Sequence, residues 1–195
     1  ERFEELPMDK FAEHTRAFVK VEDGCNRRCA YCVIQRARGP VRSRDEASVL
    51  EELRRLADAG YKEVVLTAIS LPSYGTDSGT SLVELIEKAA EVPGIERIRL
   101  GSLDPDMLHD DDISRMAAVK KLCPQFHLSL QSGCDKTLRA MRRPYTTAQY
   151  ADIAAKLRAA FGADNVSFTT DVIVGFPGET EDDFEASMAF VTGMR

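Results

Sequence analysis

Five short apolar runs alternate with stretches of helical spacing, and this alternation most limits the folds open to the chain. The runs are Ala17–Val21, Glu63–Ile69, Ile95–Leu100, Phe126–Leu130 and Val166–Val174. Strands that alternate with helices pair in parallel through right-handed crossovers. Five units are too few to close a barrel of eight. We therefore expect an α/β fold, namely a partial, open parallel β/α barrel of about five to six βα units, with its last strand missing from this chain.

Several residues between these runs are typical of helix ends. Ser43 and Ser81 are each followed three residues later by Glu, which is the spacing of a capping box. Gly60 and Gly162 follow stretches of helical periodicity and are expected to end those helices. A last helix is expected after Thr180. These ends predict helices in four of the intervals that the strands leave.

Cys25, Cys29 and Cys32 form a CxxxCxxC motif directly after the first apolar run. Thiolates bind iron–sulfur clusters, and a cubane cluster normally takes four of them, so three would leave one iron open to another ligand. Zinc sites also use short cysteine spacings. A disulfide framework fits poorly, because the chain has five cysteines, an odd number. The spacing alone favours an iron–sulfur cluster and leaves zinc open.

The segment from Cys25 to Asp45 shows no pattern of regular structure. A loop of this length in a compact domain is usually functional, and this one leaves the carboxyl end of the first strand, where parallel α/β proteins bind ligands. It is rich in arginine and has no acidic residue before Asp45; its arginines are Arg27, Arg28, Arg36, Arg38, Arg42 and Arg44. By charge alone, a solvated loop and an anion-binding surface for phosphate or RNA are equally good interpretations.

Bulk properties exclude two classes of protein. The net charge of −6 argues against a protein that binds nucleic acid over its whole surface. No apolar run is long enough to cross a bilayer, so no membrane span is expected. A chain of 195 residues is long enough for one domain with a buried core.

Tyr31, an aromatic residue directly before the third cysteine, matches the CxxxCxΦC loop of the radical S-adenosylmethionine (SAM) superfamily. The chain resembles the methylthiotransferases of that superfamily from about Thr15 onward. The segments that carry the resemblance are Asp23–Asn26, Cys29–Cys32, Ala37–Arg44, Ala59–Thr67, Ser73–Gly75, Pro93–Leu100, Leu128–Asp135, Met141–Arg143 and Thr170–Thr180.

This resemblance implies a domain organisation and two cofactors. Residues 17–195 would be the radical SAM core, and residues 1–16 a linker from an amino-terminal domain that holds a second four-iron, four-sulfur cluster. Cys25, Cys29 and Cys32 would hold the first cluster and act in catalysis through it. SAM would bind the open iron, and its reductive cleavage would give a 5′-deoxyadenosyl radical that abstracts hydrogen from the substrate.

The resemblance also implies a set of residues that bind SAM. Tyr31 would offer its backbone carbonyl to the adenine amino group, and Arg143 would bind the methionyl carboxylate. Ala68 stands where the family usually has glycine, beside the methionyl amino group. The full set is Tyr31, Thr67, Ala68, Ser102, Ser129, Gln131, Arg143, Asp171, Val174, Gly175 and Phe176.

Three branches of the family differ in substrate. The segment His127–Asp135 is similar to the branch that modifies N6-threonylcarbamoyladenosine next to the anticodon of tRNA. The branch that modifies isopentenyl-adenosine more often has proline in place of Ser129 and serine in place of Cys134. The third branch modifies an aspartate of a ribosomal protein. We expect the first activity, and the other two remain alternatives, together with a non-catalytic, zinc-stabilised RNA-binding module.

The partners expected for the first activity follow from the same resemblance. The anticodon region of tRNA would contact Arg36, Arg38, Arg42 and Arg44. A one-electron donor such as flavodoxin or ferredoxin would reduce the cluster. The protein is expected to be a cytoplasmic monomer.

Overall fold

The computed structural model describes residues 3–4 and 15–194, so the linker expected over residues 1–16 lies mostly outside the described residues. The strands are β1 (Ala17–Asp23), β2 (Arg42–Ser43), β3 (Glu63–Ala68), β4 (Arg97–Leu100), β5 (Ser102–Leu103), β6 (Gln125–Leu128) and β7 (Ser167–Thr169). The helices are α1 (Ile34–Arg38), α2 (Glu46–Asp58), α3 (Leu82–Glu91), α4 (Asp110–Ala118), α5 (Asp135–Ala140), α6 (Thr147–Phe161) and α7 (Glu181–Gly193). Two short 3-10 helices are η1 (Leu71–Ser73) and η2 (Pro105–Met107).

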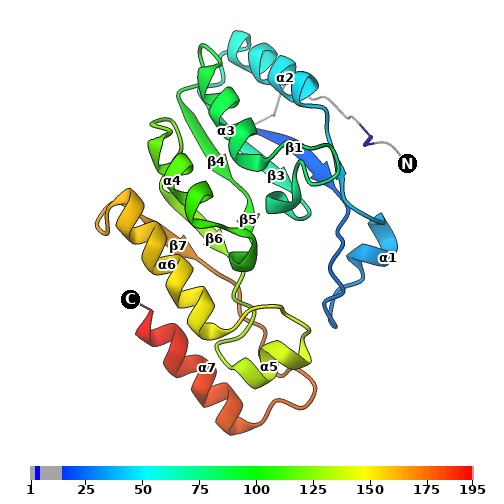
Figure 1. The fold of residues 1–195 in the computed structure, drawn as a ribbon, viewed down its shortest axis with the longest axis vertical. Helices are drawn as coiled ribbons and strands as arrows, with labels where there is room; N and C mark the ends of the chain where they lie inside the picture. The colour runs from blue at the N-terminus through cyan, green and yellow to red at the C-terminus, as the bar shows by residue number, and fades with distance from the viewer. Residues whose placement is uncertain (1–2, 5–14, 195) are drawn as a thin grey trace.

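The strands form two sheets that follow one another along the molecule (Figure 1). Their orders are β2-β1-β3-β4 and β5-β6-β7. All pairs are parallel except β1 with β2. The sheets meet where Ile98 pairs with Leu122. The N–H of Ile98 donates there to the carbonyl oxygen of Lys121 at 2.8 Å. The expected open, partial β/α barrel is therefore confirmed.

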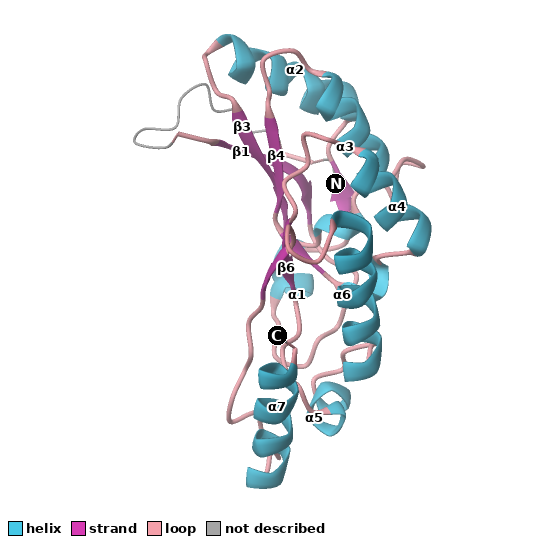
Figure 2. Ribbon diagram, turned by 90° about the vertical axis from the view of Figure 1, so that its left-hand side faces the viewer, coloured by secondary structure: helices cyan, strands magenta, loops and turns pink. Residues whose placement is uncertain are grey.

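Helices α2, α3, α4 and α6 cover one side of the sheets (Figure 2). The alternation of β1 explains this arrangement, because Ala17, Val19 and Val21 are fully buried while Phe18 between them is exposed. The expected start of α3 is confirmed, since the side chain of Ser81 accepts a hydrogen bond from the backbone N–H of Glu84. No helix among the described residues is long and apolar enough to cross a membrane.

The helix start predicted at Ser43 is wrong by two residues. Ser43 lies in β2, and its hydroxyl accepts a hydrogen bond from the N–H of Gly75 at 2.8 Å. Asp45 caps α2 instead, because its carboxylate accepts from the N–H of Ser48 at 3.0 Å. Asp and Ser are equally good caps, so the tertiary contact of Ser43 decides between them.

The strand predicted over residues 166–174 is also largely wrong, since β7 has three residues. The hydroxyl of Thr170 donates to the carbonyl of Leu128 at 2.6 Å and accepts from the N–H of Leu130 at 3.0 Å. A side chain thus takes the place of a ladder of backbone bonds. Farther along, Val172 pairs with Gln131 only as an isolated bridge.

The sequence predicted no regular structure from Cys25 to Asp45, and this prediction is partly wrong. The segment contains α1 and the short strand β2, which pairs antiparallel with the end of β1 through Glu22–Ser43 and Asp23–Arg42. This pairing returns the loop to the carboxyl end of β1, so the cysteines stay at the end of the sheet where the motif predicted them.

Candidate metal centre

The cysteine loop begins at Gly24, where only glycine fits. Its φ is +88°, and a Cβ atom would lie 2.0 Å from the carbonyl oxygen of Pro40. The two ends of the loop approach closely there, because the N–H of Cys25 donates to the carbonyl of Gly39 at 3.0 Å. The side chain of Asn26 accepts from the N–H of Val41 at 3.2 Å. The protein's own hydrogen bonds therefore close the loop.

All three motif cysteines are free thiols. Cys25 and Cys29 are half-buried and Cys32 is exposed. Cys29 and Cys32 line a cavity of about 600 Å³ together with Tyr31. Burial raises the pKa of Cys25, and the hydrogen bond from the backbone N–H of Arg27 opposes that rise. Metal binding would require this half-buried thiol to lose its proton.

The donor set fits an iron–sulfur cluster. In the described part of the chain, no three His, Cys, Asp or Glu side chains converge as ligands of one metal ion would. A four-iron cluster does not require such convergence, because each thiolate binds a different iron. Three thiols on one closed loop, two of them on a cavity of about 600 Å³, match that requirement.

Arg143 ties the cysteine loop to the strand ends. Its Nη1 donates to the sulfur of Cys29 at 3.2 Å, and its Nη2 forms an ion pair with Asp104. Its Nε donates to the hydroxyl of Tyr145 at 3.0 Å, and that hydroxyl donates to the carbonyl of Ser129 at 2.5 Å. The side chain of Arg143 is 5% exposed. The buried guanidinium therefore connects Cys29 to the segments that follow β5 and β6.

A second arginine of the cysteine loop is also bound to carboxylates. Arg27 donates twice from Nη2 to Asp106, at 2.7 and 2.8 Å, and lies 3.6 Å from Asp104. Asp104 therefore bridges Arg27 and Arg143. The sequence reasoning assigned no role to Asp104, Asp106 or Tyr145; the only signal was that Asp104 follows a predicted strand.

The other residues predicted to bind SAM lie at or after the carboxyl ends of the strands. Thr67 and Ala68 end β3 and are half-buried, and Ser102 is an exposed residue of β5. Gln131 has a positive φ of 67°, and its N–H donates to the carbonyl of Asp171 at 3.0 Å. The structure thus joins Gln131 to Asp171.

The segment Val174–Phe176 turns around a carboxylate. The N–H groups of Gly175 and Phe176 both point to Glu179 Oε2, at 2.5 and 3.3 Å. Val174 is 63% exposed. Gly175 and Phe176 are therefore held by Glu179, in the loop that leads into α7.

The four arginines predicted to contact RNA have different environments. Arg36 is exposed and lines the cysteine cavity. Arg38 and Arg42 lie 3.6 and 3.5 Å from the same oxygen of Asp23. Arg44 is 5% exposed and is paired with Glu52. The expectation for Arg44 is contradicted, because a buried and paired guanidinium offers no charge at the surface.

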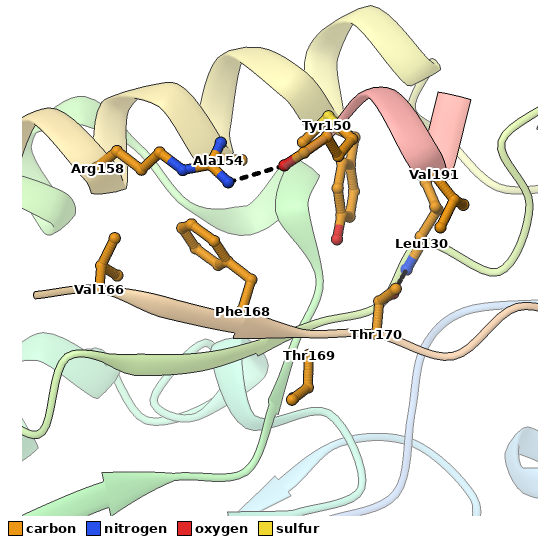
Figure 3. A pocket seen from close by; sticks show the side chains of 10 residues that line it. Leu130, Tyr150, Ala154, Arg158, Val166, Phe168, Thr169, Thr170 and Val191 are labelled. Carbon is orange, nitrogen blue, oxygen red and sulfur yellow. Dashed lines mark hydrogen bonds between the residues drawn. The ribbon is translucent and has the colours of Figure 1, made fainter. Parts of the chain in front are cut away.

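A separate cavity of about 310 Å³ lies between α6, β7 and α7 (Figure 3). Its walls are mainly apolar, and they include Tyr150, Phe168 and Val191. Arg158 reaches across it and donates to the carbonyl of Met194 at 2.8 Å. None of the predicted site residues lines it.

Comparison with known proteins gives the family. Residues 19–191 match the Radical SAM superfamily. Threonylcarbamoyladenosine tRNA methylthiotransferase MtaB of Chlamydia pneumoniae is 42% identical over 189 residues, which are 97% of this chain and 44% of that protein. tRNA-2-methylthio-N(6)-dimethylallyladenosine synthase of Oleidesulfovibrio alaskensis is 42% identical over 175 residues, 88% of this chain and 37% of that protein. The chain spans about two fifths of the length of these curated relatives.

Solved structures share the fold at low sequence identity. The radical SAM methyltransferase TsrM of Kitasatospora setae, with cobalamin and a [4Fe-4S] cluster bound, has a TM-score of 0.74 and 16% identity, over 91% of this chain and 34% of that one. Coproporphyrinogen III oxidase HemN of Escherichia coli has a TM-score of 0.63 and 14% identity, over 94% of this chain and 43% of that one. The closed three-cysteine loop lies at the end of β1 of an open parallel barrel. Because residues 19–191 of this barrel also match the family model, the chain belongs to the radical SAM superfamily.

Proposed function

We propose that this chain is the catalytic core of a tRNA methylthiotransferase that acts on N6-threonylcarbamoyladenosine next to the anticodon. The observation that carries the proposal is the closed loop of three free thiols with the buried Arg143 at Cys29. The similarity to tRNA methylthiotransferases over nearly the whole chain supports this branch of the superfamily.

Cys25, Cys29 and Cys32 would hold a [4Fe-4S] cluster with one iron left open for SAM. The cluster and SAM would supply one-electron reductive cleavage chemistry. The proposed SAM contacts are Tyr31, Thr67, Ala68, Ser102, Ser129, Gln131, Arg143, Asp171, Val174, Gly175 and Phe176. The second cluster would belong to an amino-terminal domain, outside the core of residues 17–195.

The protein's own residues orient this site. Asp104 holds Arg143 in place, so the guanidinium stays on the sulfur of Cys29. The ion pair leaves part of the arginine's charge neutralised before a ligand arrives. If Arg143 also binds the methionyl carboxylate, it must share its donors among Asp104, Cys29 and that carboxylate, and its planar fork suits such sharing.

The choice of substrate rests on the sequence of the segment around Ser129 and Cys134. Ser129 is buried, and the thiol of Cys134 donates to Asp183 Oδ1 at 3.6 Å. Both residues are thus part of the packing beside the strand ends. For the remaining partners, we propose a one-electron donor of the flavodoxin or ferredoxin type, and a cytoplasmic monomer.

Deleting the gene should remove the methylthio group from threonylcarbamoyladenosine in tRNA and leave the unmethylthiolated nucleoside in its place. Mass spectrometry of digested tRNA measures both. The full-length protein should restore the modification, and its Cys29→Ala variant should not, because the cluster loses one of its three ligands. The matched control is Cys123→Ala, a half-buried cysteine outside the loop, which should restore it.

Two results would contradict the proposal. Loss of methylthio-isopentenyl-adenosine with threonylcarbamoyladenosine unaffected would assign the chain to the other tRNA branch. Unchanged tRNA in both respects would remove the tRNA substrate and leave the ribosomal protein aspartate.

A further inference from the structure

Arg142 has a left-handed backbone, which is unusual for a residue with a side chain. Its φ is +58°, and in the described part of the chain Gln131 is the only other non-glycine residue with a positive φ. Arg142 follows α5, where its N–H donates to Arg139 and the N–H of Arg143 donates to Leu138, at 3.0 and 2.9 Å. This is the Schellman pattern, in which glycine normally takes the left-handed position.

An arginine at a glycine position costs stability, because its Cβ crowds the backbone. Such strain is often found at functional sites. The side chain of Arg142 lines the cysteine cavity, on which Cys29 and Cys32 also lie. The local cost therefore places a positive charge beside the candidate cluster.

Two further arginines line the same cavity, Arg28 and Arg36. They come from the cysteine loop and α1, while Arg142 comes from the end of α5. One backbone contact holds the two parts together, since the N–H of Ala30 donates to the carbonyl of Met141 at 2.9 Å. Three exposed guanidinium groups thus surround one cavity of about 600 Å³.

These three charges differ from most neighbouring arginines in having no acidic partner among the described residues. Within residues 3–4 and 15–194, no carboxylate forms an ion pair with Arg28, Arg36 or Arg142. Most other arginines nearby are paired: Arg27 with Asp106, Arg38 and Arg42 with Asp23, Arg44 with Glu52, and Arg143 with Asp104. Arg139 on α5 is exposed and forms no ion pair among the described residues, but it does not line the cavity. Three unpaired guanidinium groups therefore line this one cavity.

We propose that Arg28, Arg36 and Arg142 form a phosphate-binding rim that holds the backbone of the substrate RNA at the cluster cavity. This inference rests on the proposed function, because the phosphates are those of the tRNA. The planar guanidinium fork matches phosphate oxygens in pairs. A concave site suits the exposed backbone of a single-stranded loop, whereas a folded acidic protein needs a broader surface. The rim retains Arg36 from the predicted RNA-binding set and adds Arg28 and Arg142.

Arg142→Gly separates this role from a structural one, because the two readouts should move in opposite directions. In the full-length protein, the substitution should raise the melting temperature by about 2 °C, since the backbone strain is relieved. It should weaken binding of an anticodon stem-loop RNA about three- to tenfold at 0.1 M salt, and lower the slope of log K against log salt by about 0.7–0.9. Arg142→Lys keeps the charge and should keep most of the affinity and the salt slope.

The matched control is Arg54→Gln, an exposed arginine on α2 at the other end of the molecule (Figure 1). It should leave affinity unchanged, and an equal loss there would overturn the rim. A more stable Arg142→Gly protein with unchanged affinity and salt slope would also overturn it. Unchanged RNA binding with slower reduction by an acidic electron-transfer protein would overturn it too, because the rim would then belong to that partner.

The parent protein separates failure of the rim from failure of the proposed function. If the parent protein binds no stem-loop RNA, the proposed function and the rim both fail. If it binds and Arg142→Gly binds equally, only the rim fails.

Discussion

Replacing Glu52 with alanine should lower the free energy of unfolding by about 3–5 kcal/mol, because it removes the carboxylate that pairs with the buried charge of Arg44. Both side chains of this ion pair are 4–5% exposed. Arg44 lies just after β2 and Glu52 lies on α2, so the pair fixes the end of the cysteine segment to the helix that follows it. Urea denaturation followed by circular dichroism measures the loss.

The matched control is Glu51→Ala, the neighbouring exposed residue of α2, which should change stability by less than about 0.5 kcal/mol. Equal effects at positions 51 and 52 would contradict the buried pair. Replacing both partners, in Arg44→Met with Glu52→Leu, should recover most of the loss, since apolar side chains of similar size carry no desolvation cost. The double variant should also bind stem-loop RNA as the parent does, because Arg44 presents no charge at the surface.

The parts of the fold that could be predicted from the sequence are those fixed by neighbours in the chain. The alternation in β1 and the Ser81 cap of α3 each depend on a few consecutive residues. The cysteine motif is local too. Its three thiols are brought onto one loop by the turn at Gly24, which the sequence shows only as a glycine before a cysteine.

The parts that could not be predicted depend on contacts between distant segments. Ser43 has the spacing of a cap, yet Gly75 takes its hydroxyl. Arg143 was predicted to bind a ligand, but its pairing with Asp104 joins residues 39 positions apart. Arg44 looked like its neighbours in an arginine-rich loop until the fold placed Glu52 beside it. Side chains that act in networks are therefore poorly predicted from spacing, whereas the position of the three cysteines on one loop follows from residues that are close in the chain.

The buried carboxyl of Glu22 gives this domain a pH dependence of its own. Glu22 is at the end of β1 and fully buried, and its Oε2 accepts from the N–H of Ser70 at 2.8 Å. Among the residues that the structure describes, its Oε1 has no hydrogen-bond partner. Burial raises the pKa of Glu22 from 4.5 to about 7, while the hydrogen bond from Ser70 opposes the rise and the charge of Asp23 adds to it.

The sign of the effect follows from proton uptake. Between pH 4.5 and about 7, the folded protein holds a proton on Glu22 that the unfolded chain has lost. Stability from this group is therefore highest below pH 4.5 and falls as the pH rises to about 7, by about 3 kcal/mol in total. Above pH 7 the ionised carboxylate is buried and the loss is complete.

Glu22→Gln should remove this slope, because an amide does not titrate. Between pH 5 and 8.5 the parent should lose about 2–3 kcal/mol of unfolding free energy that the variant keeps. At pH 8 the variant's advantage in unfolding free energy over the parent should be reduced by about 1–3 kcal/mol. The reason is that the buried amide N–H₂ takes the place of Oε1, which has no partner among the described residues.

The matched control is Glu63→Gln. The hydrogen bond from Arg97 lowers the pKa of Glu63 to about 2 and outweighs the effect of burial, and Arg99 lowers it further. The Glu63 carboxylate stabilises the folded protein fully above pH 4.5, and this stabilisation is lost only as the pH falls toward 2. The difference in unfolding free energy between the parent and Glu63→Gln should therefore be constant from pH 5 to 8.5. A difference between parent and Glu22→Gln that is equally constant would show that Glu22 stays ionised when buried.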